Sequence, residues 1–467
     1  MSALRPIDTA LARLAGIVGD RATSAAGVRA DHGRSEAYHA ARAPDVVVFP
    51  ETTQEVQAIV SLCRELRLPL VPFGAGTSLE GNAAALHGGV CLDMGRMNQV
   101  LAINAEDMDV RVQPGITRKA LNAQLRDTGL FFPIDPGADA TIGGMASTRA
   151  SGTMAVRYGT MKDNVLALEV VLADGRVIRT AQRARKSAAG YDLTRLFVGA
   201  EGTLGVITEV TLKLHPQPEA ISSAVCAFPD LKAAVDTAIA VIQSGVPVAR
   251  IELLDAVMMK GMNLHARLGL PELPHLFFEF HGSKAYVGEQ AETAQALALE
   301  FGGLGFEWAV TPEERSRLWQ ARDNTLYAGL ALRPGAKAMI TDVCVPISRL
   351  AGCLVETAAD IAESGLTAPV VGHVGDGNFH LLVLIDPDNP DDLARAKAFN
   401  ERLVRRAIAL EGTCTGEHGI GMGKMDALVL ELGEAVDAMR LVKGALDPLN
   451  IMNPGKIFRP AGQEERT

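Results

Sequence analysis

The chain has 467 residues, 48% of them hydrophobic and 21% charged, which is an ordinary balance for a globular protein. Because one hydrophobic core rarely serves so long a chain, we expect two domains. The net charge of −10 comes without a basic block, which argues against nucleic acid as a partner.

The cysteines and the apolar runs exclude further classes of protein. No C-x-x-C pair occurs, so the cysteines fit reduced thiols better than a disulfide scaffold or an iron–sulfur cluster. They are Cys63, Cys91, Cys226, Cys344, Cys353 and Cys414. No apolar run approaches the roughly 18 residues of a membrane-spanning helix, and residues 1–21 lack the apolar core of a secretory signal. We therefore expect a cytoplasmic protein that is at most peripheral to a membrane.

The first half of the chain alternates helical and β patterns. Residues 1–44 are polar and helical, and residues 51–68 repeat apolar side chains at helical spacing. Strands are expected at 45–50, from Pro69 into a glycine-rich turn, at 89–94, at 167–172 and after the loop 191–205. The prolines of the segment 215–218 break this pattern, so we place the boundary of a domain 45–217 there.

After residue 217 the pattern is that of an α+β domain, which we place at 218–424. The expected strands are 223–228, 249–254, 275–281, 339–345, 369–373 and 379–385. The expected helices are 231–244, 287–301, 313–332, 347–364 and 390–410. Such an order predicts a largely antiparallel sheet, followed by a helical C-terminal segment 425–467.

Two histidines near the end of this domain predict a metal site. In His-Val-Gly-Asp-Gly-Asn-Phe-His, a two-residue turn at Asp376-Gly377 would place His373 opposite His380 on one face of a hairpin. Glu417 and His418 follow in a second glycine-rich segment. Two imidazoles and a carboxylate would hold the ion, with His418 beside it as a base. This set suits Zn²⁺, and also Mn²⁺ or Fe²⁺, although hydrogen-bonded histidines beside an Asp-Gly turn are also common in proteins without metal.

Three glycine-rich segments predict a site for a flat or anionic ligand. Gly74, Gly76 and Gly81 lack the spacing of a dinucleotide-binding Rossmann loop, and no Gly-Lys-Ser/Thr of a phosphate-binding P-loop follows them. Consecutive backbone amides there, with Thr77 and Ser78, could form a nest for a pyrophosphate. The segments 136–152 and 201–207 repeat this lack of side-chain bulk, which lets backbone approach a ligand closely.

Together these motifs resemble a known family. VPFGAGTSLEGN, PGADATIGGMASTRASGTMAVRYGTM, GAEGTLGVIT, GHVGDGNFH, GTCTGEHGIGMGK and MNPGKIF resemble segments of the FAD-linked D-2-hydroxy acid dehydrogenases of the vanillyl-alcohol-oxidase fold. Within that group the resemblance is greatest to the cytochrome-linked D-lactate dehydrogenases. It runs from about residue 30 to about residue 460. It implies an α+β, two-domain fold with an FAD-binding domain and an antiparallel-sheet substrate domain.

The resemblance also assigns residues to the cofactors. Residues that would hold the FAD pyrophosphate are Pro72, Gly74, Ala75, Gly76, Thr77, Ser78, Gly81 and Asn82. Residues that would line the rest of the FAD are Pro136, Gly137, Thr141, Gly143, Gly144, Ala146, Ser147, Gly152, Tyr158, Glu201, Gly202, Ile207 and Asn453. The relatives with covalent FAD carry a histidine in the first loop, where this chain has Thr77 and Ser78, so we expect non-covalent FAD. His373, His380 and Glu417 would bind one divalent metal, zinc or manganese, and His418 would be the catalytic base.

The activity implied is oxidation of D-lactate, or a similar short D-2-hydroxy acid, with hydride transfer to flavin N5. Arg322, with Lys337 as a second candidate, would bind the substrate carboxylate, and apolar Leu382 favours a short monocarboxylate. Electrons would pass to cytochrome c, a quinone or an electron-transfer flavoprotein, and the protein could be a homodimer. Alternatives are a D-2-hydroxyglutarate dehydrogenase or a glycolate oxidase flavoprotein subunit. More distant ones are an ether-lipid synthase, a sugar-lactone oxidase or a non-catalytic accessory subunit.

Overall fold

A computed structural model describes residues 6–35, 37–266 and 269–459, and the chain divides into two compact units. The first unit comprises Met1–Ser151, Thr160–Gln217 and Glu417–Thr467, and the second comprises Gly152–Gly159 and Pro218–Gly416. The chain thus changes unit after residue 217, at the prolines noted in the sequence. It returns to the first unit at residue 417, eight positions before residue 425, where the C-terminal segment was expected to begin.

The first unit contains the N-terminal half of the chain and the last helices. Its helices are α1 (Pro6–Val18), α2 (Ala26–His32), α3 (Thr53–Leu66), α4 (Arg118–Leu125), α5 (Ile142–Thr148), α7 (Met161–Asn164), α8 (Leu193–Phe197), α16 (Met425–Leu432) and α17 (Ala435–Leu446). Its strands are β1 (Ala22–Thr23), β2 (Val46–Val48), β3 (Leu70–Phe73), β4 (Val90–Asp93), β5 (Val100–Asn104), β6 (Asp109–Val112), β7 (Leu130–Phe131), β8 (Val165–Val171), β9 (Val177–Arg179), β10 (Val206–Lys213) and β11 (His215–Pro216).

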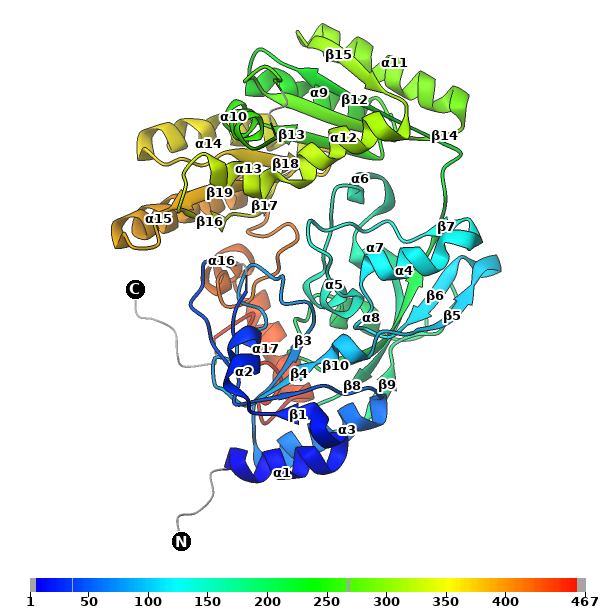
Figure 1. Cartoon of the computed structure of the whole chain (residues 1–467), viewed down its shortest axis with the longest axis vertical. Helices are drawn as coiled ribbons and strands as arrows, with labels where there is room; N and C mark the ends of the chain where they lie inside the picture. Colours follow the sequence, from blue (N-terminus) through cyan, green and yellow to red (C-terminus); the bar gives the residue numbers. More distant parts are fainter. Residues whose placement is uncertain (1–5, 36, 267–268, 460–467) are drawn as a thin grey trace. The chain divides into compact units, whose positions relative to one another are not determined.

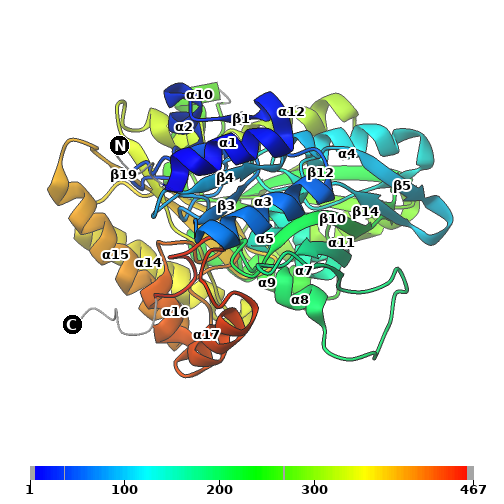
Figure 2. The same cartoon turned by 90° about the horizontal axis from the view of Figure 1, so that it is seen from below.

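Two main sheets organise this unit. The four-stranded sheet has the order β1-β2-β4-β3, in which β2, β4 and β3 are parallel, and the five-stranded antiparallel sheet has the order β5-β6-β10-β8-β9. Helix α1 lies alongside α3, as Figures 1 and 2 show, and both bury apolar side chains in the core of the four-stranded sheet. A short ribbon pairs β7 with β11.

Helix α3 shows how the sequence sets a helix in this unit. The Thr52 side chain accepts the backbone N–H of Glu55 and caps the first turn, and Arg67 ends the helix in a left-handed conformation with φ of 51°. The apolar positions at helical spacing, Val56, Ile59, Val60 and Cys63, are buried as the pattern predicted.

The second unit contains one large sheet and the remaining helices. Its strands are β12 (Ala220–Ala227), β13 (Arg250–Leu254), β14 (His275–Gly282), β15 (Leu304–Ala309), β16 (Lys337–Ile340), β17 (Val343–Cys344), β18 (Val370–His373) and β19 (Asn378–Ile385). Its helices are α6 (Ala155–Tyr158), α9 (Leu231–Gln243), α10 (Ala256–Ala266), α11 (Lys284–Glu300), α12 (Pro312–Asp323), α13 (Thr325–Ala331), α14 (Leu350–Ser364) and α15 (Pro390–Ala409).

The sheet of this unit has the order β15-β12-β14-β13-β18-β19-β16, with β17 also paired to β19, and every pairing is antiparallel. The expectation of an α+β domain with an antiparallel sheet is therefore confirmed. Helices α10, α12 and α13 cover one face, and α9, α11 and α15 cover the other (Figure 1). Figure 2 shows α14 beside α15.

Two helical predictions differ from the structure. The helix expected at 313–332 is two helices, because Asn324 separates α12 from α13. The N-terminal segment 1–44, expected to be helical, also contributes the strand β1, which pairs with β2. None of the helices that the structure describes combines the length and apolar character that a membrane crossing requires.

Candidate active site

The first glycine-rich segment follows strand β3 in the first unit. Residues 72–79 are at least partly accessible, whereas Gly81 and Asn82 are buried. Gly76 and Gly81 have φ of 71° and 68°, a conformation that favours glycine. The segment therefore presents mainly backbone at the end of a buried strand, as a nest for a pyrophosphate requires.

The structure brings the other two glycine-rich segments against the first. A Cβ atom added to Gly74 would collide with the hydroxyl of Thr141, which caps α5, and one added to Gly202 would lie 3.0 Å from Pro72 Cγ. The Glu201 N–H donates to the Ser147 carbonyl at 2.9 Å. Residues far apart in the sequence thus form one cradle of small side chains and backbone, which fits a large planar dinucleotide.

The C-terminal segment closes this cradle from within the same unit. The Asn453 side chain donates to the carbonyl oxygens of Asn82 at 2.8 Å and Glu201 at 2.7 Å. Its backbone N–H donates to the Leu70 carbonyl at 2.8 Å, and the Leu70 N–H donates to Ile451 at 2.8 Å. Asn453 therefore ties the first and third segments together beside β3.

Glu201 has its side chain directed at the protein itself. Its carboxylate accepts from the Asn82 side chain at 2.7 Å, Ile420 N–H at 2.7 Å and Gly421 N–H at 2.9 Å. Burial raises the pKa of Glu201 to about 7, although these hydrogen bonds act in the opposite direction. The carboxylate thus holds the segment just after His418, and only the backbone of Glu201 is left to face a cofactor.

The structure places three further residues that were expected to line FAD as follows. Gly152 and Tyr158 belong to the second unit, where the Tyr158 hydroxyl forms a 2.7 Å hydrogen bond with His281 Nδ1. Ile207 belongs to the first unit, but it is 7% exposed and packs in that unit's hydrophobic core.

The imidazoles of His373 and His380 lie together on the sheet of the second unit, with ring centroids 5.3 Å apart. The hairpin register expected from the sequence is wrong. His373 pairs with Asn378, so the loop between β18 and β19 has four residues, not two. His380 is two residues beyond Asn378 on β19. Because strand side chains alternate between faces, that even offset keeps both imidazoles on one face.

Each imidazole is held through Nδ1 by an acceptor. His373 Nδ1 lies 2.7 Å from Glu252 Oε1, and His380 Nδ1 lies 3.0 Å from the Thr341 carbonyl oxygen. A carbonyl can only accept, so His380 carries its proton on Nδ1, and a carboxylate favours the same tautomer in His373. The ligand lone pair is then on Nε2 in both rings, so the pair fits a divalent metal.

Glu252 was not among the residues selected from the sequence. Its side chain is fully buried, and its second oxygen accepts from Arg322 Nε at 2.9 Å and Nη2 at 2.6 Å. Burial by itself raises the pKa of the Glu252 carboxyl, yet its interactions with His373 and Arg322 hold that pKa below its usual value overall. A charged residue inside the apolar strand Arg-Ile-Glu-Leu-Leu was the available signal.

The two residues selected for the substrate carboxylate differ in placement. Arg322 projects from α12, is 8% exposed, and directs Nη1 at the Thr325 hydroxyl at 3.4 Å. Lys337 is exposed and pairs with Ile385, five residues from His380 along β19. An odd offset places it on the opposite face of the sheet, so the structure does not bring Lys337 to the imidazoles.

The segment that precedes Glu417 ends beside the imidazole pair. Thr413 pairs with Cys344, the Thr415 hydroxyl donates to Asp342 Oδ2 at 2.7 Å, and Gly416 packs directly against the Asn378 amide. Glu417 is the next residue, and it begins the last stretch of the first unit. In that unit the His418 carbonyl accepts from the Asn82 side chain at 3.4 Å.

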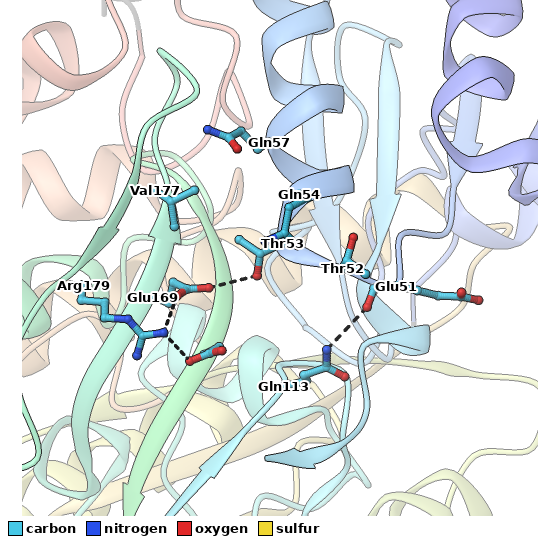
Figure 3. A pocket seen from close by; sticks show the side chains of 10 residues that line it. Glu51, Thr52, Thr53, Gln54, Gln57, Gln113, Glu169, Val177 and Arg179 are labelled. Carbon is cyan, nitrogen blue, oxygen red and sulfur yellow. Dashed lines mark hydrogen bonds and ion pairs between the residues drawn. The ribbon is translucent and has the colours of Figure 1, made fainter. Parts of the chain in front are cut away.

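A cavity of about 460 Å³ in the first unit does not involve the residues selected from the sequence. Its lining includes Thr53, Glu169, Arg179 and Glu209. Arg179 donates to Glu169 at 2.6 Å and to Glu209 at 3.1 Å, and the Thr53 hydroxyl donates to Glu169 at 2.9 Å (Figure 3). These carboxylates already have partners, so the cavity has the character of a compensated surface network.

Comparison with known proteins identifies the architecture. Residues 44–181 match the family model described as FAD binding domain, and residues 217–457 match the model described as FAD linked oxidases, C-terminal domain. The structure resembles 4-ethylphenol oxidase from Gulosibacter chungangensis, with a TM-score of 0.82 and 19% identity over 98% of each chain. It also resembles p-cresol methylhydroxylase, with a TM-score of 0.81 and 18% identity over 97% of this chain and 96% of that one.

Curated relatives are similar over most of their length. A protein of Danio rerio named probable D-lactate dehydrogenase, mitochondrial, is 54% identical over 95% of this chain and 90% of its own. A protein of Arabidopsis thaliana named D-lactate dehydrogenase (cytochrome), mitochondrial, is 49% identical over 96% of this chain and 80% of its own. A glycolate oxidase subunit of Bacillus subtilis is 38% identical over 89% of each chain.

These findings confirm the expected FAD cofactor and the vanillyl-alcohol-oxidase fold. The chain belongs to the family of FAD-linked oxidases, built from an FAD-binding domain and an FAD-linked oxidase C-terminal domain.

Proposed function

We propose that the protein is an FAD- and divalent-metal-dependent dehydrogenase that oxidises D-lactate, or a similar short D-2-hydroxy acid, to the 2-oxo acid. The names of the relatives that are 54% and 49% identical support the substrate. The observation that carries the metal part is the pair of Nδ1 hydrogen bonds, which fix His373 and His380 in the tautomer that ligates through Nε2.

When bound, FAD would supply the hydride acceptor and the metal would polarise the substrate hydroxyl and lower its pKa. Residues of the cradle formed by 72–82, 136–147, 201–202 and Asn453 would hold FAD without a covalent bond. His373, His380 and Glu417 would hold the metal. Glu417 qualifies because it directly follows Gly416, which packs on the Asn378 amide beside His373 in the sheet.

Two further residues would act on the substrate. Arg322 would bind the carboxylate through Nη1, since its other nitrogen donors are engaged by Glu252. His418 would accept the hydroxyl proton, because a neutral imidazole titrates near physiological pH. Its backbone is fastened by Asn82, and Glu201 holds the residues after it.

The size of the substrate is limited by Leu382. This side chain lies two residues after His380 and therefore on the same face of β19. It is 5% exposed and packs in the apolar cluster that also contains Met258 and Ala328. A second carboxylate would have to be buried among these side chains, which is costly, so a monocarboxylate fits better.

The identity of the metal, the electron acceptor and the location complete the proposal. Zinc or manganese would occupy the metal site, since both accept imidazole and carboxylate ligands. A cytochrome is the favoured electron acceptor, since relatives 49% and 42% identical carry that word in their names. Homodimerisation and a cytoplasmic location remain predictions.

Anaerobic mixing of the purified flavoprotein with D-lactate tests the proposal. We expect rapid bleaching of the flavin absorbance with D-lactate, slower bleaching with D-2-hydroxyglutarate, and none with L-lactate. Prior removal of metal by a chelator should abolish bleaching and leave the flavin bound. Full bleaching in protein shown to be metal-free would rule out the metal part.

A pair of variants separates the site from general damage. His373→Asn should lose both metal and turnover. His275→Asn should keep both, because His275 is a buried histidine on the same sheet whose Nδ1 lies 2.8 Å from the Leu273 carbonyl. Equal losses in the two variants would count against a specific role for His373.

A second candidate is a glycolate-oxidising subunit, favoured by the relative from Bacillus subtilis that is 38% identical. The same experiment distinguishes it, because a glycolate enzyme should be bleached faster by glycolate than by D-lactate.

A further inference from the structure

Two polar rows cross one face of the sheet in the second unit. Ser223, Glu279 and Arg250 stand opposite one another on β12, β14 and β13. In the second row His373 on β18 stands opposite Asn378 on β19. It also stands opposite Glu252 on β13, because the residues Leu253 and Gly372 pair and the two strands are antiparallel. Each row therefore contains one buried glutamate, Glu279 in the first and Glu252 in the second.

The two glutamates make similar contacts. Glu252 accepts from His373 at 2.7 Å and from Arg322 at 2.6 Å. Glu279 accepts from His281 Nε2 at 2.9 Å and lies 3.4 Å from Arg250 Nε. Glu252 is 0% exposed and Glu279 is 7% exposed. The histidine that Glu252 contacts is the metal ligand proposed above, whereas His281 is not.

We propose that Glu252 is a positioning residue that makes His373 a metal ligand, and that Arg322 in turn fixes Glu252. The inference rests on the proposed function, because it assumes the metal on His373. Glu252 itself does not ligate the ion in this proposal. Its Oε1 accepts the Nδ1 proton of His373, which leaves the lone pair on Nε2 and orients the ring.

The division of the two oxygens explains the specificity of this arrangement. Arg322 donates twice, from Nε and Nη2, to Oε2. These two hydrogen bonds hold the carboxylate in one orientation, because a rotation would break both of them at once. Oε1 is consequently held toward His373. Carboxylates that orient metal-bound histidines in this way typically contribute 10- to 100-fold to metal affinity.

Glu252→Gln tests the proposal with almost no change in shape. An amide offers one acceptor oxygen, and the two donors of Arg322 will keep it. The amide NH₂ then faces His373 Nδ1, which must accept and move its proton to Nε2. In that tautomer Nε2 cannot bind a metal.

We expect the metal dissociation constant of the flavin-loaded variant to rise about 10- to 100-fold, measured by competition with a fluorescent chelator for Zn²⁺ or Mn²⁺. The matched control is Glu279→Gln, which makes the same change in the other row and should alter the constant less than about threefold. An unchanged constant in Glu252→Gln, or equal increases in both variants, would overturn the inference.

Glu252→Asp covers the case in which the amide variant does not fold. It keeps the charge but withdraws the carboxylate from His373 by one methylene, so the dissociation constant should again rise, and an unchanged value would overturn the inference. The wild-type protein separates this test from the proposed function. If it binds no metal and oxidises D-lactate all the same, the metal part of that function fails. If the wild-type protein binds metal and the Glu252 variants bind it with the same dissociation constant, the inference alone fails.

Discussion

The two imidazoles of the second unit have their Nδ1 atoms held by acceptors of different charge. His373 Nδ1 lies 2.7 Å from the carboxylate of Glu252, whereas His380 Nδ1 lies 3.0 Å from the Thr341 carbonyl and 3.6 Å from Asp342 Oδ1. A carboxylate makes the imidazole a stronger electron donor through Nε2 than a carbonyl does. The two rings are thus unequal ligands, and a loss at His373 should cost more metal affinity than a loss at His380.

Gly416 offers a test of the approach to Glu417. A Cβ atom there would collide with the Asn378 amide, which donates to Asp342 Oδ1 and the Val343 carbonyl, both at 2.8 Å. We expect Gly416→Ala to displace the next residue and raise the metal dissociation constant at least about tenfold, with flavin content unchanged.

Gly352→Ala is the matched control for this substitution. A Cβ atom at Gly352 in α14 meets nothing within 4 Å. Alanine in a helix is favoured over glycine by about 0.5–1 kcal/mol, so this variant should be at least as stable as wild type and bind metal normally. Normal metal affinity in Gly416→Ala would show that the packing of Gly416 does not position Glu417 as a metal ligand.

At the scale of an element, the hairpin of β18 and β19 shows how far local rules reach. Asp376-Gly377 is a sound signal for a two-residue turn. However, the Val345 N–H donates to the Gly377 carbonyl at 3.0 Å, and β17 pairs with β19 from the other side. These long-range bonds, which no local pattern reports, set a four-residue loop. The shared face of the imidazoles could still be predicted, because a shift by two residues preserves it.

The glycine-rich segments could be predicted from the sequence, whereas the hydrogen bonds between distant residues could not. Lack of side-chain bulk is visible in the sequence, and it selected segments that the structure joins. The bonds between Glu252 and Arg322 and between Glu201 and Ile420 connect residues 70 and 219 positions apart. Such pairs depend on the tertiary fold. The placements of Tyr158 in the second unit and of Lys337 on the far face depend on it equally.

Helix α17 anchors the C-terminal segment through a buried ion pair. Lys443 donates to Asp447, to the Thr203 carbonyl and to the Met452 carbonyl, while Asp447 accepts the N–H groups of Ile451 and Met452. Lys443→Met would leave a buried unpaired carboxylate, which costs roughly 3–5 kcal/mol. We expect lower stability in chemical denaturation together with loss of FAD, because Asn453 follows directly.

Asp437→Ala on the same helix is the control for Lys443→Met. Its ion pair with Arg440 is exposed, so the change should cost less than about 1 kcal/mol and leave FAD bound. If Lys443→Met bound FAD with unchanged affinity, residues 451–453 would not support the cradle.

The ribbon of β7 and β11 should make stability depend on pH. His215 bonds Asn164 Oδ1 through Nε2 at 2.9 Å, and burial, aided by Lys213 and Arg185, lowers its pKa to about 4. In the unfolded chain a histidine titrates near 6.5, so between these values the unfolded state binds more protons. The contribution of His215 is therefore complete above about pH 6.5 and is lost as the pH falls toward 4.

Urea unfolding of the wild type and of His215→Gln at pH 7.5, 5.5 and 4.5 measures this contribution. The difference in free energy of unfolding should shrink, or change sign in favour of the variant, as the pH falls. A difference independent of pH would exclude His215 as its source.

At the scale of the whole molecule, each unit has its own hydrophobic core and its own part of the chemistry. The cores of the first unit contain Leu70, Ile142 and Met452, and that of the second contains Trp319 and Leu382. The cradle proposed for FAD belongs to the first unit and the imidazole pair to the second. FAD should therefore stabilise the first unit directly.

Scanning calorimetry can separate these contributions. We expect two transitions in protein stripped of FAD and metal, and FAD should raise the transition that belongs to the first unit. A ligand present at 100 times its dissociation constant adds about 2.7 kcal/mol to the unit that binds it. A single transition that FAD shifts as a whole would mean that the units unfold as one.

The pairing of Leu70 with residues 451–453 has a consequence for biosynthesis. A ribosome makes β3 early and its neighbour only some 380 positions later, whereas residues 218–416 emerge as one uninterrupted stretch. Residues 218–416 can thus fold during translation, whereas the first unit cannot complete its fold until residues 451–453 have been made. Vitamin-derived cofactor should accordingly be captured after translation of that tail, and nascent chains stalled upstream of it should emerge colourless.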